Sequence, residues 1–133
     1  MAYEHEFVTA FARDDASISS TTETVTASGE ANISETIAAN ATNLQINLAI
    51  DVSALKSIFM LASTNMSIYT NDVSGGSPDH TINLIAGRPL IWTNNSYFAS
   101  PFAGDASDVT NIRVTNGSVE GTLQICVVQD ATP

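Results

Sequence analysis

Basic residues are scarce in this sequence: Lys and Arg together number 4 against 14 Asp and Glu, which gives a formal net charge of -10 over 133 residues. Binding to the nucleic-acid backbone requires clustered Lys and Arg that displace counterions. Anionic membrane surfaces attract the same residues. We therefore expect neither a nucleic acid nor a membrane as a partner, and interpret the negative charge as a source of solubility.

Cysteine is almost absent, since Cys126 is the only one, and no internal disulfide can form. Cys126 lies in LQICVV, whose apolar neighbours predict a buried small side chain rather than a reactive thiol. The N-terminal segment MAYEHEFVTAF lacks a basic region followed by an apolar run, and no segment approaches the length needed to span a bilayer. The sequence therefore predicts synthesis without a conventional export signal.

Helical periodicity is also missing, and the strongest pattern in the chain has a period of two. The segment NLQINLAIDV alternates strictly over residues 44–52, which predicts a strand with one buried face. The Thr-rich segment SISSTTETVTAS, at 17–28, is typical of an exposed or edge strand. A single helical turn is expected from a cap at Ser53 through Lys56.

The rest of the chain consists of short apolar segments separated by turns. We expect a hairpin over residues 58–70 with its turn at STN, two short strands in HTINLIAG and RPLIWTNN, and a final strand pair in TNIRVTN and VEGTLQICVV. A chain of this length with 44% hydrophobic residues fits one domain with a real core. The sequence thus predicts an all-β protein, an antiparallel β-sandwich or jelly-roll-like barrel over residues 1–133.

Residues for catalysis and for cofactor binding are few. The two histidines are His5, near the N-terminus, and His80, in a Gly-Pro loop, and no G-x-S-x-G elbow is present. No Gly-rich phosphate-binding loop occurs either. Oxygen ligands for Ca²⁺ occur without the spacing of an EF-hand; they are Asn71, Asp72, Ser74 and Asp79. We therefore expect no enzyme activity, no cofactor and no metal.

Aromatic residues are scarce, at 7% of the chain, yet several lie together in LIAGRPLIWTNNSYFASPF, residues 84–102. In a strand, Leu90 and Trp92 share one face and Ile91 lies on the other, so one large apolar side chain needs cover. Three interpretations stay open: a cap on the end of the core, a contact between subunits, and a platform for stacking sugars. The candidate contact residues are Trp92, Tyr97, Phe98 and Phe102, together with Phe7 and Phe11 in a candidate flexible N-terminal arm, residues 1–12.

The order of strand and turn segments in this chain resembles that of a known group of proteins. The order DVSALKSIFMLAS, TNDVSGGSPDHTINLIAGRPLIWTN, DVTNIRVTN and TLQICVVQD, over roughly residues 44–130, is similar to small acidic β-proteins encoded among bacteriophage head genes. The resemblance implies a virion structural protein, a decoration or cement protein that binds the major capsid protein on the capsid exterior after synthesis in the bacterial cytoplasm. It does not extend to residues 1–43, where we expect the capsid-binding surface.

Self-association as a homotrimer is expected from the apolar surface of residues 90–102. Two other classes of function compete with capsid decoration. A carbohydrate-binding or tail-fibre type adhesion module would use Trp92 and Tyr97 as stacking platforms. A β-sandwich hydrolase would require two converging carboxylates, and nothing in the sequence singles out such a pair.

Overall fold

The described residues of the protein form an all-β fold with ten strands. The computed structural model describes residues 2–71, 78–102 and 108–130. The strands are β1 (Tyr3–Arg13), β2 (Ala16–Ala27), β3 (Gly29–Ile37), β4 (Leu44–Ile50), β5 (Leu55–Ala62), β6 (Met66–Thr70), β7 (His80–Leu84), β8 (Leu90–Thr93), β9 (Val109–Asn116) and β10 (Gly121–Gln129). The helical content of these ranges is one 3₁₀ turn, η1 (Val52–Ala54), and they contain no helix that could cross a membrane.

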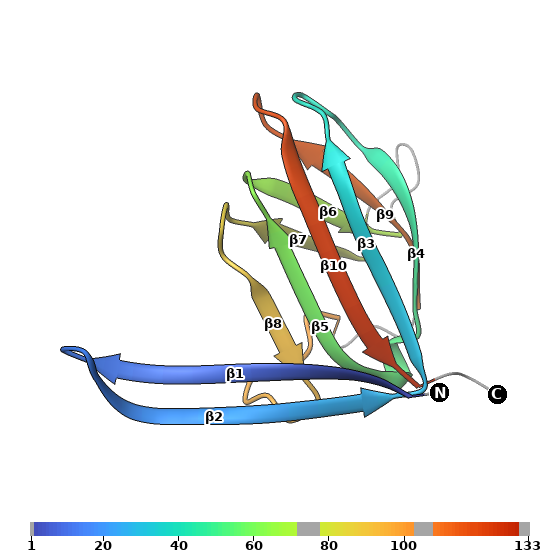
Figure 1. The fold of residues 1–133 in the computed structure, drawn as a ribbon. Coiled ribbons are helices and arrows are strands. Elements are labelled where there is room, and N and C mark those ends of the chain that lie inside the picture. The colour runs from blue at the N-terminus through green and yellow to red at the C-terminus, as the bar shows by residue number, and fades with distance from the viewer. Residues whose placement is uncertain (1, 72–77, 103–107, 131–133) are drawn as a thin grey trace.

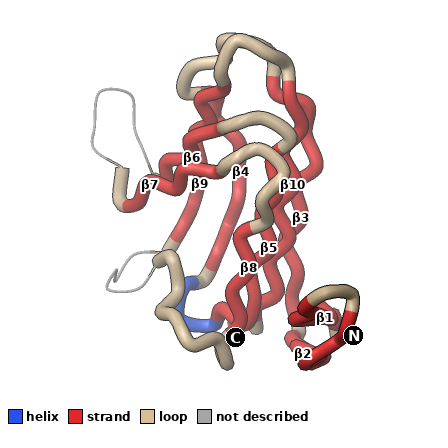
Figure 2. Tube along the Cα trace, turned by 90° about the vertical axis from the view of Figure 1, so that its left-hand side faces the viewer, coloured by secondary structure: helices blue, strands red, loops and turns tan. Residues whose placement is uncertain are grey.

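Eight of the strands form two four-stranded sheets in the orders β3-β10-β5-β8 and β4-β9-β6-β7. All of their neighbouring strands pair antiparallel. The two sheets lie face to face, as Figures 1 and 2 show. The prediction of an antiparallel β-sandwich is therefore confirmed.

The core lies between the sheets and follows from the alternation of each strand. In β4, Leu48 and Ile50 are buried while Gln45, Asn47 and Ala49 are exposed, as the pattern of residues 44–52 predicts. Neighbouring strands contribute the same alternation from both sheets. The largest fully buried side chains include Ile37, Ile58, Met60, Ile68, Ile112 and Ile125.

The hairpin predicted over residues 58–70 is wrong, because its two strands belong to different sheets. Strand β5 pairs with β10 and β8, whereas β6 pairs with β7 and β9. The turn between them therefore crosses from one sheet to the other. The final pair β9 and β10 crosses in the same way. Alternation is identical in a hairpin and in such an arch, so the local sequence cannot distinguish them.

The predicted helix cap at Ser53 is also wrong, since the capping residue lies two positions earlier. Asp51 caps η1, since its Oδ1 accepts hydrogen bonds from the backbone nitrogens of Ser53 and Ala54 at 3.1 and 3.3 Å and from Ser53 Oγ at 2.7 Å. A carboxylate is the stronger acceptor for backbone N–H groups at a helix start. Leu55 and Lys56 consequently belong to β5.

Strands β1 and β2 form a separate two-stranded sheet, which we call the arm (residues 3–27). The sequence predicts a flexible arm of residues 1–12; in the structure residues 3–13 pair with β2, from Tyr3–Ala27 to Arg13–Ala16, with a register shift between Phe11 and Ala12. Asp14 and Asp15 both have positive φ, as a two-residue type I′ turn requires. The arm crosses the sheet β3-β10-β5-β8 and extends beyond β8 (Figure 1).

Candidate functional site

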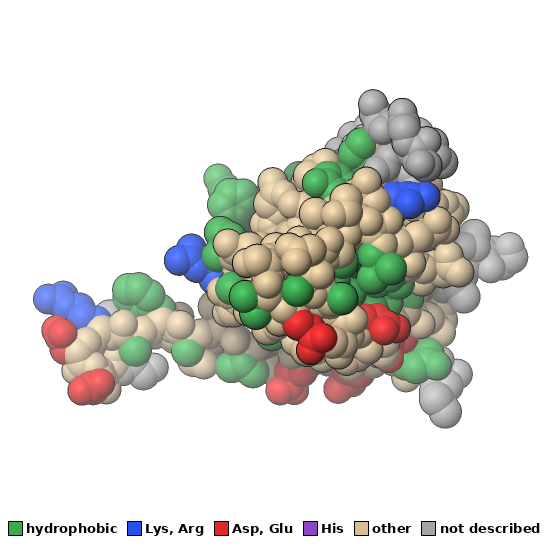
Figure 3. Space-filling view, turned by 90° about the horizontal axis from the view of Figure 1, so that it is seen from above, with side chains coloured by type: hydrophobic (Ala, Val, Ile, Leu, Met, Phe, Trp, Pro, Cys, Tyr) green, Lys and Arg blue, Asp and Glu red, His purple; other side chains and the backbone are tan. Residues whose placement is uncertain are grey.

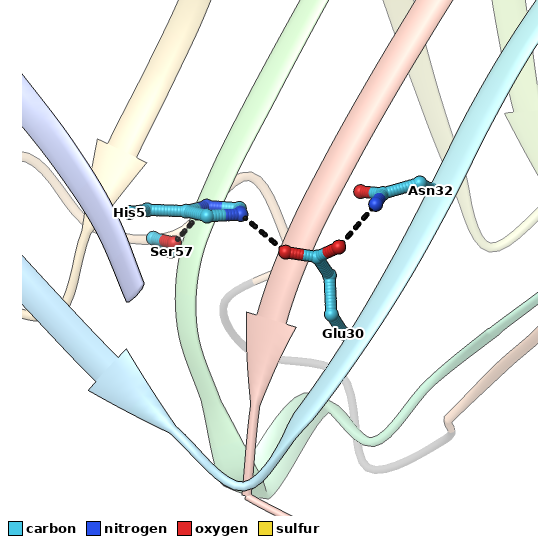
Figure 4. Close-up of polar contacts among 4 residues, drawn as sticks. All are labelled: His5, Glu30, Asn32 and Ser57. Carbon is cyan, nitrogen blue, oxygen red and sulfur yellow. Dashed lines mark hydrogen bonds and ion pairs between the residues drawn. The ribbon is translucent and has the colours of Figure 1, made fainter. Parts of the chain in front are cut away.

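His5 fixes the base of the arm to the sandwich. Its Nδ1 lies 3.1 Å from Ser57 Oγ on β5, and its Nε2 lies 3.1 Å from Glu30 Oε2 on β3. Asn32 Nδ2 donates to the other oxygen of the Glu30 carboxylate, so a polar chain joins β1, β3 and β5 (Figure 4). With the ring proton on Nε2, His5 donates to Glu30 and accepts from the Ser57 hydroxyl, which satisfies both ring nitrogens.

A second attachment lies at the edge strand β8. Glu23 of β2 accepts hydrogen bonds from Thr93 Oγ1, at 2.9 Å and 3.1 Å to its two oxygens, and from Asn95 Nδ2 at 3.0 Å. Thr93 is buried although it lies at the edge of the sheet. These bonds hold the arm where it leaves the body.

Apolar packing fills the space between the two attachments. Val25 and Ala27 of β2 are buried, and the arm contacts β5 and β10. Alternation places Ser57 and Val128 on the outer face of the sheet, yet both are fully buried. We conclude that the base of the arm (residues 3–7 and 23–27) is a packed layer on the outer face of the sandwich.

The distal half of the arm, residues 8–22, has a different character. All its described side chains, in residues 8–16 and 19–22, are exposed. Figure 3 shows the arm as a narrow extension from the body, with charged side chains at its end; these belong to Arg13, Asp14 and Asp15. An isolated two-stranded hairpin is marginally stable in water, so this half of the arm gains stability when another surface covers it.

The two candidate contact residues on the arm have different environments. Phe7 belongs to the base, where it is half-buried and meets the His5 ring edge-to-face at 6.2 Å. Phe11 is 62% exposed. Alternation along β1 places it on the face that carries His5 and Phe7, while Val8, 64% exposed, lies on the opposite face. Phe11 is therefore an exposed aromatic side chain on the distal half of the arm.

The aromatic segment predicted from the sequence does not form one surface. Phe102 is 1% exposed and its ring packs edge-to-face against His80, so it belongs to the core and is not the contact residue that the sequence suggested. Trp92 is half-buried, packs against the core, and donates from Nε1 to the backbone oxygen of Phe98 at 3.1 Å. Tyr97 and Phe98 remain, 95% and 78% exposed, with their rings edge-to-face at 5.2 Å.

A small apolar depression lies beside these exposed aromatics. Its volume is about 190 Å³. Its walls come from β8 and the segment that follows, and carbon atoms form most of its surface. The lining residues are Leu90, Ile91, Trp92, Phe98, Ala99 and Pro101.

An apolar row on the outer face of the sheet was not anticipated from the sequence. Cys126, Phe59 and Ile91 lie in register on β10, β5 and β8, and Ile91 is 51% exposed. The continuous apolar run IFMLA was the available indication, because a strand covered on both faces loses its alternation. Cys126 is half-buried on this outer face rather than in the core, and burial, with a smaller contribution from Glu30, raises the pKa of its thiol.

The described residues among the candidate Ca²⁺ ligands make hydrogen bonds within the protein. Asn71 donates from Nδ2 to Asp79 Oδ2 and to the backbone oxygen of Asp108, both at 2.8 Å, and so closes the loop between β6 and β7. Two of the proposed Ca²⁺ ligands, Asp72 and Ser74, lie outside the described residues. Within the part of the chain that the structure describes, no group of three or more His, Cys, Asp or Glu side chains is arranged to hold a metal ion.

Comparisons with family models, curated proteins and solved structures find no match for this chain. The features of the molecule that bear on its function are the arm, the depression and the exposed aromatic pair.

Proposed function

We propose that this protein is a non-enzymatic decoration protein that binds the exterior of a bacteriophage head and reinforces it. The observation that carries this proposal is the arm: its base is packed on the sandwich, while its distal half is exposed and carries Phe11 outward. An extension of this kind suits a subunit that links neighbours on a protein shell. The resemblance of residues 44–130 to proteins encoded among phage head genes favours a phage head as that shell.

The charge of the chain favours an external position. A protein with a net charge of -10 is repelled by packaged DNA. Each molecule would contribute weak contacts with the major capsid protein and with its own neighbours, and such contacts repeated over a shell add through avidity. We propose the homotrimer as the assembled unit, in which exposed apolar groups such as Ile91, Tyr97 and Phe98 are covered.

The test is made on purified virions with and without the gene for this protein. The proposal expects the protein in wild-type particles, and expects particles without it to assemble but to release DNA at a lower temperature. Virions that contain none of the protein, or heads whose thermal stability does not depend on it, would refute the proposal.

A shortened-arm variant tests the role of the arm on the same particles. Phe7 and Glu23 are paired in register, so replacing residues 8–22 by Asn-Gly closes the hairpin directly above its base. Both attachments of the base remain. We expect this variant to fold, and to occupy the heads less fully than the wild type. Equal occupancy would restrict the function to the body of the protein.

A carbohydrate-binding or adhesion module is the second candidate, and the exposed pair Tyr97 and Phe98 favours it. Exposed aromatic rings stack on the apolar faces of sugars. Trp92 does not take part in such a platform, because its ring packs against the core. Binding on a glycan array that free sugar competes away, and that Tyr97→Ala abolishes, would favour this function over decoration.

A further inference from the structure

Phe11 and the apolar depression are complementary in size and chemistry. Cavities of about 150 Å³ with apolar walls bind a benzene molecule, and the depression between Leu90 and Pro101 has about 190 Å³. One phenyl ring therefore fits it. An aromatic anchor in an apolar pocket is the usual centre of a protein interface.

The two features lie close to the same edge of the molecule without meeting in one chain. The arm passes β8, where Glu23 bonds to Thr93 and Asn95, before it leaves the body (Figure 1). The depression is built on β8 and on the segment that follows Asn95. Phe11 lies four residues beyond Phe7 along the arm, remains 62% exposed and is not among the lining residues.

The outer face of the sheet is already a surface that binds an arm. The base of the arm covers Ser57 and Val128, and its Glu23 accepts a hydrogen bond from Thr93 of β8. Ile91 lies two residues before Thr93 on the same outer face, is 51% exposed and forms one wall of the depression. A second arm on this wall would continue the interface that the first arm begins.

We propose that Phe11 on the arm of one copy of this chain occupies the depression between Trp92, Phe98 and Pro101 of a second copy. Each copy then donates one arm and accepts one, so the contact closes head-to-tail in a ring, as the proposed homotrimer requires. It also covers Ile91 and the exposed Phe98. The contact belongs to the isolated protein and does not depend on the surface of a phage head.

Sedimentation of four purified proteins over a concentration series tests the contact: the wild type, Phe11→Ser, Val8→Ser and Ala99→Leu. The wild type is expected to exceed the monomer mass of 14.0 kDa. Phe11→Ser should weaken association about 30-fold or more, and Ala99→Leu should do the same by filling the depression. Val8→Ser, an equally exposed change on the opposite face, should associate like the wild type.

Crosslinking of mixed single-cysteine variants shows whether the contact is between chains. In a Cys126→Ser background, Phe11→Cys and Ala99→Cys proteins mixed and oxidised should form a disulfide-linked heterodimer, and Val8→Cys with Ala99→Cys should not. Circular dichroism melting of each variant confirms that it folds.

A wild type that sediments at 14.0 kDa at every concentration overturns the proposal. Equal weakening by Val8→Ser and Phe11→Ser also overturns it, because the contact would then be indifferent to the face of the arm. Neither result bears on the decoration function, which virion composition decides.

Discussion

His5 Nε2 lies 3.1 Å from Glu30 Oε2, across a sequence separation of 25 residues, and this pair joins the arm to the edge strand of the sandwich. The same ring reaches Ser57 on β5 through its other nitrogen. A histidine in a segment that looks like a flexible terminus is therefore the attachment point of the arm.

Replacing His5 by Ala should loosen the base of the arm. A hydrogen bond to a charged partner contributes about 1.5–3 kcal/mol to stability, and the side chains of His5 and Glu30 are 15% and 22% exposed, so we expect a loss of about 1–2 kcal/mol in the free energy of unfolding. Urea unfolding measures it, and hydrogen exchange should accelerate in β1 more than in β10. Glu4→Ala, on the exposed face of the same strand, is the matched control and should change stability by less than about 0.5 kcal/mol.

Asn116→Ala should be the more costly change at the opposite end of the sandwich. The amide of this buried side chain donates to the backbone oxygens of Ile37, Ala38 and Val119 at 3.1, 3.1 and 2.8 Å. Its loss leaves carbonyl groups of two chain segments without a donor, which costs about 2–3 kcal/mol. Denaturant unfolding with an unchanged m-value checks this. A cost no greater than that of the exposed Asn94→Ala would contradict the assigned role.

Gly121→Ala should destabilise the start of β10, because a Cβ there would overlap Thr64 Oγ1 and lie 2.9 Å from Met66 Cε. Met66 is buried and has little room to move, so we expect a cost of about 1–3 kcal/mol. Gly117→Ala is the control, since nothing lies within 4 Å of its added Cβ. Thermal melting compares the two, and a similar melting temperature for both variants would show that the turn at Thr64 yields freely.

The thiol of Cys126 should react slowly at neutral pH. Burial first, and the charge of Glu30 second, raise its pKa above the ordinary value of 9.0. The folded state thus holds the thiol proton more tightly than the unfolded state, so its contribution to stability is complete below the unfolded pKa and is lost as the pH rises through the folded pKa. The rate of alkylation measured against pH should therefore reach its plateau at a higher pH than that of an unperturbed thiol.

Glu30→Gln provides the control for that titration. Removing the carboxylate should move the alkylation profile to lower pH, because one of the two causes of the raised pKa is gone. The profile in urea gives the unfolded reference. A folded-state profile that coincides with the urea profile would contradict the structure around Cys126.

The chain fixes the positions of most strands by itself, because alternation reports which side chains one face of a strand buries. Residues 44–52 illustrate this, since β4 runs from Leu44 to Ile50 and buries Leu48 and Ile50 on the expected face, although Ile46 is half-buried and Leu44 is exposed. The edge-like character of residues 17–28 also holds, since among the described strands β2 pairs with β1 in a two-stranded sheet, although Val25 and Ala27 are buried.

Only the tertiary structure decided which strands are neighbours. The segments 55–62 and 66–70 have a turn between them that suits a hairpin, yet they are divided between the two sheets. Pairing is settled by long-range partners such as β10 for β5 and β9 for β6. The local sequence does not predict these partners, because a strand shows the same alternation of apolar and polar residues in either sheet.

The candidate contact residues divide in the same manner. The sequence by itself indicated an aromatic segment with apolar surface at residues 90–102, and it indicated Phe7 and Phe11 as candidate contact residues. Folding decided that Phe102 is covered by the core, that Tyr97 and Phe98 stay exposed, and that Phe11 extends beyond the body. The exposure of a side chain depends on which distant segments of the chain pack against it. These contacts exist only in the folded molecule.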